Sequence, residues 1–347
     1  MRYKLFGTSG LRVSELCLGT MIFGDMRAVG ATKEESRQIF EAFVEAGGNF
    51  IDTANTYANG MSEQLVGEFT QRERERFVIA TKYTLSQRAT DPNGGGNHRK
   101  NLVHSLDASL KRLKTDYIDL YWLHAWDFLT PVEEVMRALD DQVRSGKILY
   151  VGVSDTPAWI VAQANTLAAL RGWTPFVGLQ VEYSLIERDV ERELLPMART
   201  FGMAVTPWSP LGGGVLSGKY NANRSAAGRL AEQVDERTLR IANGVREIAE
   251  EIQHSSAQVA LAWLRSQPGT IIPIIGSRRA AQFRENLGCL DVRLTDDQVQ
   301  RLNALSRPHL GFPHDFLASD GVRRLIYGET FDKLDVSNRP HGPARTT

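Results

Sequence analysis

The chain has 347 residues, of which 42% are hydrophobic, and its 41 lysines and arginines balance 41 aspartates and glutamates. This length and composition provide for a large buried core, and α/β barrels routinely reach this size as one domain. Because the chain has no net charge, we expect neither nucleic acid nor an anionic membrane as a partner. Any anion-binding site must therefore be local.

The two cysteines, Cys17 and Cys289, stand in apolar surroundings without a CxxC or metal-ligand spacing. We expect two buried thiols that pack as small hydrophobic groups, which suits a reducing compartment. The N-terminus lacks an apolar core followed by a small-residue cleavage site. No stretch reaches the roughly 18 consecutive apolar residues of a membrane span. The sequence predicts a cytoplasmic protein without membrane attachment.

Short apolar, β-branched runs alternate with longer amphipathic segments along the whole chain. The predicted strands are 15–19, 49–53, 77–82, 117–124, 148–154, 176–180, 203–208 and 270–277. Near-continuous apolar strands are typical of a parallel sheet that is covered on both faces. Helix signals lie between the strands: Thr32 with Glu35 predicts a capping box, and the Gly47-Gly48 pair predicts a helix end.

These eight strand–helix units show no break in composition, which favours a closed (β/α)8 TIM barrel over an open doubly wound sheet. We expect residues 1–347 to form a single domain. The opening segment YKLFGTSGLRVS (3–14) predicts a β-hairpin that turns near Gly10 and covers the floor of the barrel.

Three segments depart from the plain repeat: the Gly/Asn-rich loop 91–97, the polar stretch between Trp208 and Asp235, and the tail after Arg307. Insertions of this kind in a barrel usually shape the substrate pocket. We expect the tail, about 308–347, to be partly irregular, and its last residues to be disordered.

Polar or aromatic residues close most of the predicted strands, at the end of a barrel where active sites lie. They are Asp52, Lys82, His124, Ser154, Gln180, Trp208 and Ser277. The polarity of loops explains any one of them. It explains less well an Asp, a Lys and a His that each end a core strand, because charged groups there require partners.

With Tyr57, these three residues form a set that is suited to the reduction of a carbonyl group. Hydride transfer builds negative charge on the carbonyl oxygen, which requires a nearby acid. We expect the Lys82 ammonium to lower the pKa of the Tyr57 phenol from about 10. Asp52 would pair with Lys82, and His124 would orient the substrate oxygen. Each residue taken singly also has an ordinary structural explanation, as a cap, a surface charge, a loop aromatic or a core histidine.

Several segments resemble the aldo-keto reductase family. They are FIDTANTY (50–57), ATK (80–82), DLYWLH (119–124), GVS (152–154), QVEYS (180–184), TPWSPLGGGVLSGKY (206–220) and IIGSRRAAQFREN (274–286). The match runs in the family's order from about Leu5 to about Leu305 and is more specific than any single motif. The resemblance implies an NAD(P)H cofactor, aldehyde or ketone substrates, and a catalytic tetrad of Asp52, Tyr57, Lys82 and His124.

No GxGxxG motif joins a strand to a helix, and no Walker lysine motif is present. The resemblance instead implies a cofactor in the barrel mouth. Its nicotinamide end would meet Thr20, Met21, Asp52, Ser154, Gln180 and Trp208. Its pyrophosphate would meet a loop that includes Ser209, Pro210, Leu211, Gly214, Ser217 and Lys219. Its adenosine end would meet Gly276, Ser277, Arg278, Gln282, Glu285 and Asn286.

Arg278 suits a 2′-phosphate, which favours NADPH over NADH. Alternatively, Arg278 and Arg279 are solvated charges at a helix start, and Gly212–Gly214 is a plain flexible turn. Two positions depart from the family pattern: Asp155 stands where Asn is more usual, and Ala58 stands where Gly is usual.

For the substrate pocket we expect Phe23, Trp126 and Phe128, with Phe312 or Phe316 from the tail closing over it. Such a wall favours apolar or aromatic carbonyl compounds, although loop aromatics also serve to pin their own loops. The residues His309, His314 and Asp315 match no standard metal-ligand spacing, and we expect no metal.

Two other functions compete with carbonyl reduction. One is a redox-sensing or regulatory subunit that binds NADP(H) on the same barrel, since a fold does not determine a function. The other is a barrel hydrolase that uses Asp52 and a second carboxylate, which leaves Lys82 and Trp208 without a role. The sequence indicates neither the physiological substrate, nor the direction of the reaction, nor an oligomeric state.

Overall fold

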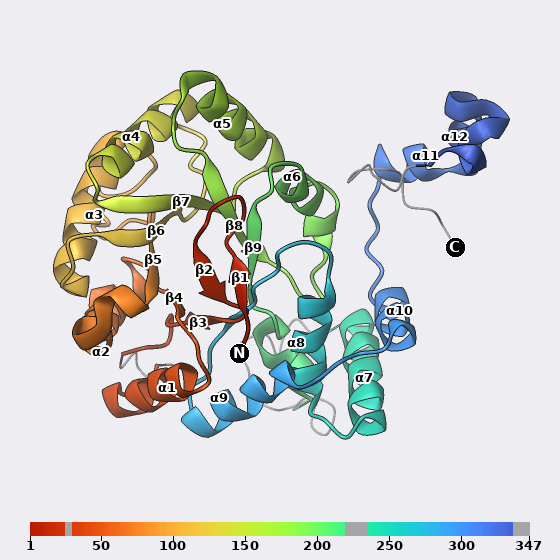
Figure 1. Cartoon of the computed structure of the whole chain (residues 1–347), viewed down its shortest axis with the longest axis horizontal. Helices are drawn as coiled ribbons and strands as arrows, with labels where there is room; N and C mark the ends of the chain where they lie inside the picture. Colours follow the sequence, from red (N-terminus) through yellow and green to blue (C-terminus); the bar gives the residue numbers. More distant parts are fainter. Residues whose placement is uncertain (25–29, 219–234, 336–347) are drawn as a thin grey trace.

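The computed structural model of the chain describes residues 1–24, 30–218 and 235–335 (Figure 1). Its centre is an eight-stranded sheet in which the strands follow one another in chain order, with β10 beside β3. All seven neighbouring pairs in this order are parallel. The strands are β3 (Cys17–Gly19), β4 (Phe50–Asp52), β5 (Val78–Tyr83), β6 (Ile118–Leu123), β7 (Ile148–Ser154), β8 (Phe176–Glu182), β9 (Ala204–Trp208) and β10 (Ile274–Ile275).

Two backbone hydrogen bonds close the sheet into a barrel. Val205 in β9 donates to the carbonyl of Thr270 at 2.8 Å, and its own carbonyl accepts from Ile272 at 2.8 Å. The predicted (β/α)8 TIM barrel is therefore confirmed, and each of its eight predicted strands overlaps an observed one.

Helices surround the barrel as an outer ring (Figure 1). They are α1 (Lys33–Glu45), α2 (Met61–Thr70), α3 (Arg99–Leu113), α4 (Val132–Arg144), α5 (Ala158–Arg171), α6 (Leu194–Thr200), α7 (Glu236–Glu251), α8 (Ser256–Ser266), α9 (Ala280–Leu287) and α10 (Asp296–Leu305). Short 3-10 segments join them: η1 (Tyr57–Gly60), η2 (Gln71–Arg76), η3 (Asp189–Glu191), η4 (Gly212–Ser217) and η6 (Gly288–Leu290). Thr32 caps α1 by accepting from the backbone N–H of Glu35 at 3.2 Å, but the predicted capping box is only half formed, because the Glu35 carboxylate binds the Ala280 N–H.

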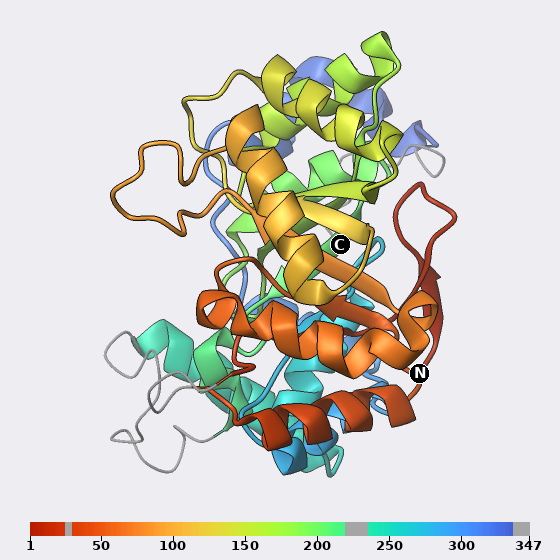
Figure 2. The same cartoon turned by 90° about the vertical axis from the view of Figure 1, so that its left-hand side faces the viewer.

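The predicted hairpin, β1 (Tyr3–Leu5) with β2 (Arg12–Ser14), is antiparallel and closes one end of the barrel (Figure 2). Phe6 leaves the hairpin and packs edge-on against Trp122 inside the barrel, with ring centroids 6.3 Å apart. Gly152 leaves room for the Trp122 ring, because a Cβ there would approach it to 2.3 Å. A packed floor of this kind leaves the opposite end of the barrel for loops, among them the long segment after β5 (Figure 2).

After α10 the chain forms an arm that contains α11 (His314–Ala318), α12 (Asp320–Tyr327) and η7 (Gly328–Lys333). Figure 1 shows this arm beside the barrel, beyond α6, and not over its centre. The described part of the predicted tail is therefore largely helical. The predicted disorder of residues 337–347 lies outside the described residues.

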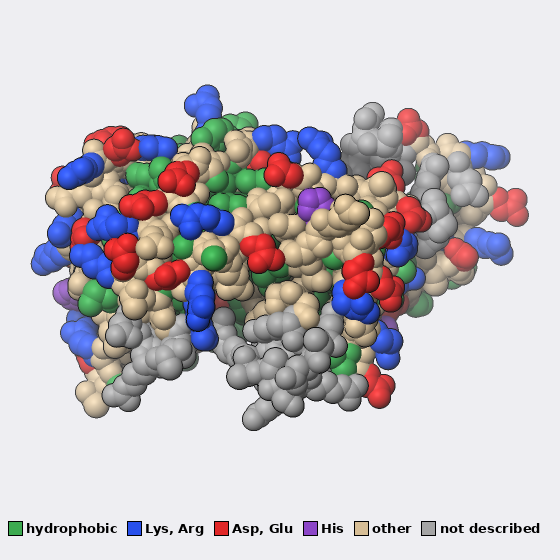
Figure 3. Space-filling model, turned by 90° about the horizontal axis from the view of Figure 1, so that it is seen from below, with side chains coloured by type: hydrophobic (Ala, Val, Ile, Leu, Met, Phe, Trp, Pro, Cys, Tyr) green, Lys and Arg blue, Asp and Glu red, His purple; other side chains and the backbone are tan. Residues whose placement is uncertain are grey.

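Acidic and basic side chains are interspersed on the face that is seen in Figure 3, without a large area of one sign. The described residues contain no helix that is both long enough and apolar enough to cross a membrane.

Candidate active site

Parallel strands bring the four predicted tetrad residues to the same end of the barrel. Asp52 is the last residue of β4, Lys82 lies near the end of β5, and His124 directly follows β6. Tyr57 begins η1, five residues after Asp52. Because neighbouring parallel strands end together, residues 30 and 72 positions beyond Asp52 in the chain come to lie near it.

The ammonium of Lys82 is the centre of this cluster. Its side chain has no exposed surface, and it forms an ion pair with Asp52. It also donates to the carbonyl oxygen of Thr53 at 2.9 Å and to the phenol oxygen of Tyr57 at 3.2 Å. All three N–H groups of the ammonium therefore have acceptors. Because an ammonium only donates, the Tyr57 oxygen must accept, which leaves the phenol hydrogen free to be donated elsewhere.

The predicted direction of the Tyr57 pKa shift is wrong. Burial raises the pKa of Tyr57 more than the nearby Lys82 ammonium lowers it, and the net pKa lies above the ordinary value. Burial lowers the pKa of Lys82, but the Asp52 carboxylate and Tyr57 outweigh that effect and the net pKa is raised. Near neutral pH this site therefore holds an ammonium beside a protonated phenol.

His124 completes the cluster as a neutral imidazole. Its ring stands edge-on to that of Tyr57, with centroids 6.0 Å apart and an interplanar angle of 81°. Burial, with a smaller contribution from the Lys82 charge, lowers the pKa of His124 to about 3. Within the described residues its Nδ1 atom is buried without a hydrogen-bond partner.

The side chains predicted to meet a nicotinamide surround the tetrad, but several already have protein partners. Gln180 donates from Nε2 to the second carboxylate oxygen of Asp52 at 3.0 Å. Thr20 is buried, and its hydroxyl donates to the Asp52 carbonyl oxygen at 2.9 Å. Ser154 is also buried, at the end of β7, whereas Met21 is 37% exposed. Sequence reasoning did not indicate that Gln180 and Thr20 help to hold Asp52.

Asp155, one of the two departures from the family pattern, holds Trp208 in place. Its Oδ1 accepts from the indole N–H of Trp208 at 3.1 Å, and its backbone has a φ of 41°. Burial raises the pKa of Asp155, and the bond from Trp208 offsets part of that rise. Asp155 thus fixes the ring that was predicted to stack on the cofactor.

Ala58, the other departure, lies in a left-handed turn that directly follows Tyr57. The φ values of Ala58 and Asn59 are 47° and 54°, and Gly60 follows at 88°. Left-handed backbone favours glycine because it has no Cβ. The structure therefore gives a physical reason for glycine at this position, and the alanine carries backbone strain.

The predicted pyrophosphate loop, from Ser209 to Gly218, has an unusual backbone. Ser209 and the three glycines Gly212–Gly214 all have positive φ values, and so does Gly218. The hydroxyl of Ser217 donates to the carbonyl oxygen of Gly214 at 2.7 Å, while Pro210 is buried and Leu211 is half-buried. The N–H groups of the three glycines already have acceptors within the loop: Gly212 and Gly213 donate to the carbonyl and hydroxyl oxygens of Ser209, and Gly214 donates to the Leu211 carbonyl oxygen. Lys219 lies outside the described residues.

The predicted adenosine segment begins at Gly276 and continues into α9. Arg278, Gln282 and Glu285 have exposed side chains, whereas Ser277 and Asn286 are buried. The hydroxyl of Ser277 donates to the carbonyl oxygen of Arg279 at 2.9 Å. The first backbone N–H of α9, from Ala280, donates to the carboxylate of Glu35 in α1, a contact that sequence reasoning missed. No sequence signal indicated it, since the two residues are 245 positions apart.

The aromatic residues predicted for the substrate pocket lie in different environments. Trp126 is half-buried and Phe128 is 68% exposed, both in the segment after β6. Phe23 has no exposed surface and packs against Phe69, with ring centroids 6.3 Å apart. It belongs to the core and lines no opening.

The tail aromatics Phe312 and Phe316 are 84% and 55% exposed, on the arm that lies beside the barrel. The expectation that they cover the mouth is therefore wrong for this structure. The arm is held at its base by His314, which pairs with Glu193 at 2.8 Å.

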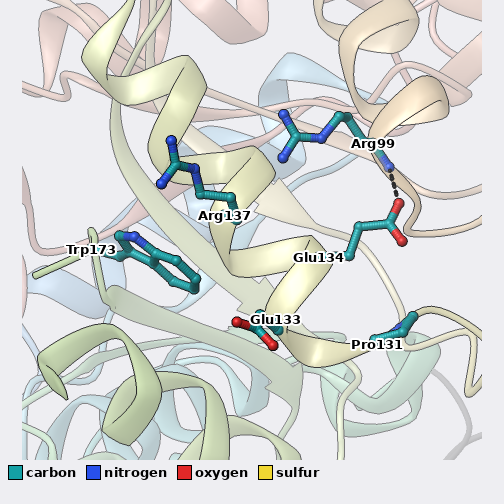
Figure 4. Close-up of a pocket in the computed structure, with 6 residues that line it drawn as sticks. All are labelled: Arg99, Pro131, Glu133, Glu134, Arg137 and Trp173. Carbon is teal, nitrogen blue, oxygen red and sulfur yellow. Dashed lines mark hydrogen bonds between the residues drawn. The ribbon is translucent and has the colours of Figure 1, made fainter. Parts of the chain in front are cut away.

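Two surface pockets lie near the ends of helices. A groove of about 480 Å³ runs along α4 and is lined by Arg99, Pro131, Glu133, Glu134, Arg137 and Trp173 (Figure 4). Its charges are already paired: Glu134 accepts from the backbone N–H of Arg99 at 3.0 Å, and Arg137 pairs with Asp141 at 2.9 Å. A smaller pocket lies beside Asp155 and Glu182 at the barrel mouth.

Cys17 and Cys289 are buried free thiols, and burial raises the pKa of Cys289 to about 12. In the described part of the chain, no three His, Cys, Asp or Glu residues form a group that could hold a metal ion.

A sequence model of the aldo/keto reductase family matches residues 15–307 of the chain. A norsolorinic acid reductase from Emericella nidulans is 41% identical over 319 residues, which cover 89% of this chain and 82% of the relative. A putative aryl-alcohol dehydrogenase from Saccharomyces cerevisiae is 39% identical over 332 residues, which cover 90% and 88% of the two chains. An aryl-alcohol dehydrogenase from Pestalotiopsis microspora is 37% identical over 333 residues, which cover 93% and 87%.

Three observations point to the same conclusion: the barrel fold, the Asp52–Lys82–Tyr57–His124 cluster and the extent of these matches. The chain is an oxidoreductase that acts on carbonyl or alcohol groups, and it belongs to the aldo/keto reductase family.

Proposed function

We propose that this chain reduces an aldehyde or ketone to an alcohol with NADPH, and that Tyr57 is the general acid. The observation that carries the proposal is the hydrogen bond from the Lys82 ammonium to the Tyr57 oxygen at 3.2 Å. It orients the phenol so that its hydrogen remains available for a substrate oxygen. It also provides a positive charge that stabilises the phenolate once the proton has left.

Each member of the cluster has a separate task in this mechanism. When it is bound, NADPH supplies a hydride to the carbonyl carbon. Tyr57 donates its proton to the carbonyl oxygen, and His124, as a neutral imidazole, holds that oxygen by a hydrogen bond. Asp52 keeps Lys82 charged in a site from which water is largely excluded, since neither side chain is more than 4% exposed.

The residues around the cluster fit a nicotinamide dinucleotide. Trp208 offers a ring face for the nicotinamide, and its orientation is fixed by Asp155. The pyrophosphate would run along the loop from Ser209 to Gly218, where the lack of side chains at Gly212–Gly214 allows a ligand to approach the backbone closely. The exposed guanidinium of Arg278 would bind the 2′-phosphate of NADPH, which NADH lacks.

We propose aromatic carbonyl compounds as the substrates. Two relatives are named aryl-alcohol dehydrogenases, and Trp126 and Phe128 follow β6, next to His124. An aromatic ring packs favourably on such side chains by offset or edge-on contact. Phe23 is not part of this pocket.

The decisive experiment compares Tyr57→Phe with the unaltered protein. We expect kcat for NADPH-dependent reduction of a substituted benzaldehyde to fall at least about 100-fold, because only the acid is removed. The dissociation constant for NADPH, measured by calorimetry, should change less than about twofold. Tyr3→Phe is the matched control, because the Tyr3 hydroxyl binds the Gly47 carbonyl oxygen, on the hairpin side of the barrel.

Full activity in Tyr57→Phe would refute the role of this residue. Tight NADPH binding with no turnover in the unaltered protein, over a broad set of carbonyl compounds, would favour the redox-sensing alternative instead.

A further inference from the structure

A carboxylate of the protein occupies the helix start where the adenosine end of the cofactor is expected. Glu35 lies in the first turn of α1, and α1 runs next to α9 (Figure 1). Its Oε1 atom accepts the hydrogen bond of the Ala280 backbone N–H, which is the first N–H of α9. A helix N-terminus attracts anions, because its free N–H groups and its dipole both favour negative charge. Here the anion is Glu35.

The neighbouring charges of the α1 turn are engaged elsewhere. Lys33 pairs with Glu68 at 2.8 Å, and Arg37 pairs with the same carboxylate at 2.9 Å. Glu34 accepts from the side chain of Gln38 at 3.1 Å. Glu35 is therefore the residue of this turn that is directed at α9.

Some of the groups that would bind a 2′-phosphate already have partners within the protein, and others are exposed. The Ser277 hydroxyl is turned toward the carbonyl oxygen of Arg279, at 2.9 Å, and the Ala280 N–H is bound to Glu35. The guanidiniums of Arg278 and Arg279 are exposed, and neither pairs with a carboxylate in the described parts of the chain. A phosphate at this point would gain the arginines but would have to lie beside Glu35 or displace it.

We infer that Glu35 is a specificity-determining residue that lowers the preference for NADPH over NADH which Arg278 alone would produce. This inference rests on the proposed function, because it assumes that the dinucleotide's adenosine end binds at α9. A carboxylate repels the dianionic 2′-phosphate of NADPH. The same carboxylate accepts a hydrogen bond from the free 2′-hydroxyl of NADH, as acidic residues do in other dinucleotide sites.

Coulomb's law gives the size of the effect. A carboxylate and a phosphate dianion about 6 Å apart, in a dielectric near that of water, repel each other enough to change a dissociation constant about tenfold. Screening by salt reduces this repulsion. We therefore expect removal of the Glu35 charge to lower the dissociation constant of NADPH about three- to tenfold at low ionic strength.

The test is calorimetric titration of the full chain with NADPH and, separately, with NADH, without substrate. In Glu35→Gln we expect NADPH to bind three- to tenfold more tightly, while NADH binds equally well or more weakly. Glu34→Gln is the matched control, and neither cofactor should respond to it. Glu35→Asp keeps the charge, so its ratio of the two dissociation constants should stay close to that of the unaltered protein.

Salt separates a charge effect from a purely structural one. The increase in NADPH affinity that Glu35→Gln produces should shrink at least twofold between 50 and 500 mM KCl, because the Debye length falls from roughly 14 to roughly 4 Å. An unchanged NADPH-to-NADH ratio in Glu35→Gln, or a ratio that responds equally to Glu35→Asp, would overturn the inference and leave the proposed function standing. Failure of the unaltered protein to bind either cofactor would overturn both.

Discussion

The Asp52–Lys82 pair allows a quantitative test of how the site is held together. Both side chains are buried, the lysine with 0% and the aspartate with 4% of its surface exposed. Lys82→Met leaves the Asp52 carboxylate with one remaining donor among the described residues, the amide of Gln180 at 3.0 Å. Asp52→Asn leaves the ammonium with neutral acceptors alone: the oxygens of Thr53 and Tyr57 and the introduced amide oxygen. Each change leaves a buried charge without its counter-charge.

Breaking a buried ion pair from one side costs about 3–5 kcal/mol in the free energy of unfolding. For 347 residues at about 2.1 cal/mol/K each, the unfolding entropy is about 0.7 kcal/mol/K. Each single variant should therefore lower Tm by about 4–7 °C. The double variant buries no charge at this pair, so we expect it to lose no more stability than either single variant. This result corresponds to a coupling energy of about 3–5 kcal/mol between the two residues.

The assay is thermal unfolding followed by circular dichroism at pH 7, on the two single variants and the double variant. The matched control is the exposed pair of the same residue types, Lys147 and Asp107, whose atoms lie 2.8 Å apart and whose side chains are 40% and 43% exposed. The cycle of Lys147→Met and Asp107→Asn should give a coupling below about 1 kcal/mol. If the double variant at the active site loses the sum of the two single losses, the pair does not act as a unit and the reasoning is refuted.

Two further predictions follow from the geometry around Tyr57. Reduction should keep a constant kcat/KM from pH 5 to pH 9, because the pKa of His124 is lowered to about 3 and that of Tyr57 is raised. The acid must be protonated, so activity should fall only as the pH rises through the Tyr57 pKa; a falling limb between pH 6 and 7 in initial-rate data would contradict this assignment. Ala58→Gly should raise the free energy of unfolding by up to about 1 kcal/mol, because the φ of 47° strains an alanine but not a glycine. Urea denaturation measures this change, and a loss of stability would show that Ala58 is not strained.

The local pattern of the chain predicted most of the barrel and three of the side chains that cluster at one end of it. Apolar runs such as 118–123 have the period and length of buried parallel strands, and their order alone determines which of them are neighbours. Because parallel strands end on one side, a polar residue at the end of each run belongs to one site. The sequence alone therefore groups Asp52, Lys82 and His124 at one site.

Three features of the site required the tertiary structure. The direction of the Tyr57 pKa shift depends on how far burial outweighs the Lys82 charge, which no local pattern contains. Phe23 follows a strand just as a pocket residue would, yet packing against Phe69 places it in the core.

The contact of Glu35 with the first N–H of α9 joins residues 245 positions apart. The sequence by itself determined the order of the elements and the residues at the strand ends, because these follow from short-range periodicity. Only the tertiary structure decided which side chains are buried, which groups are protonated and which residue binds the start of α9. Each of these depends on neighbours that the fold brings together from distant segments of the chain.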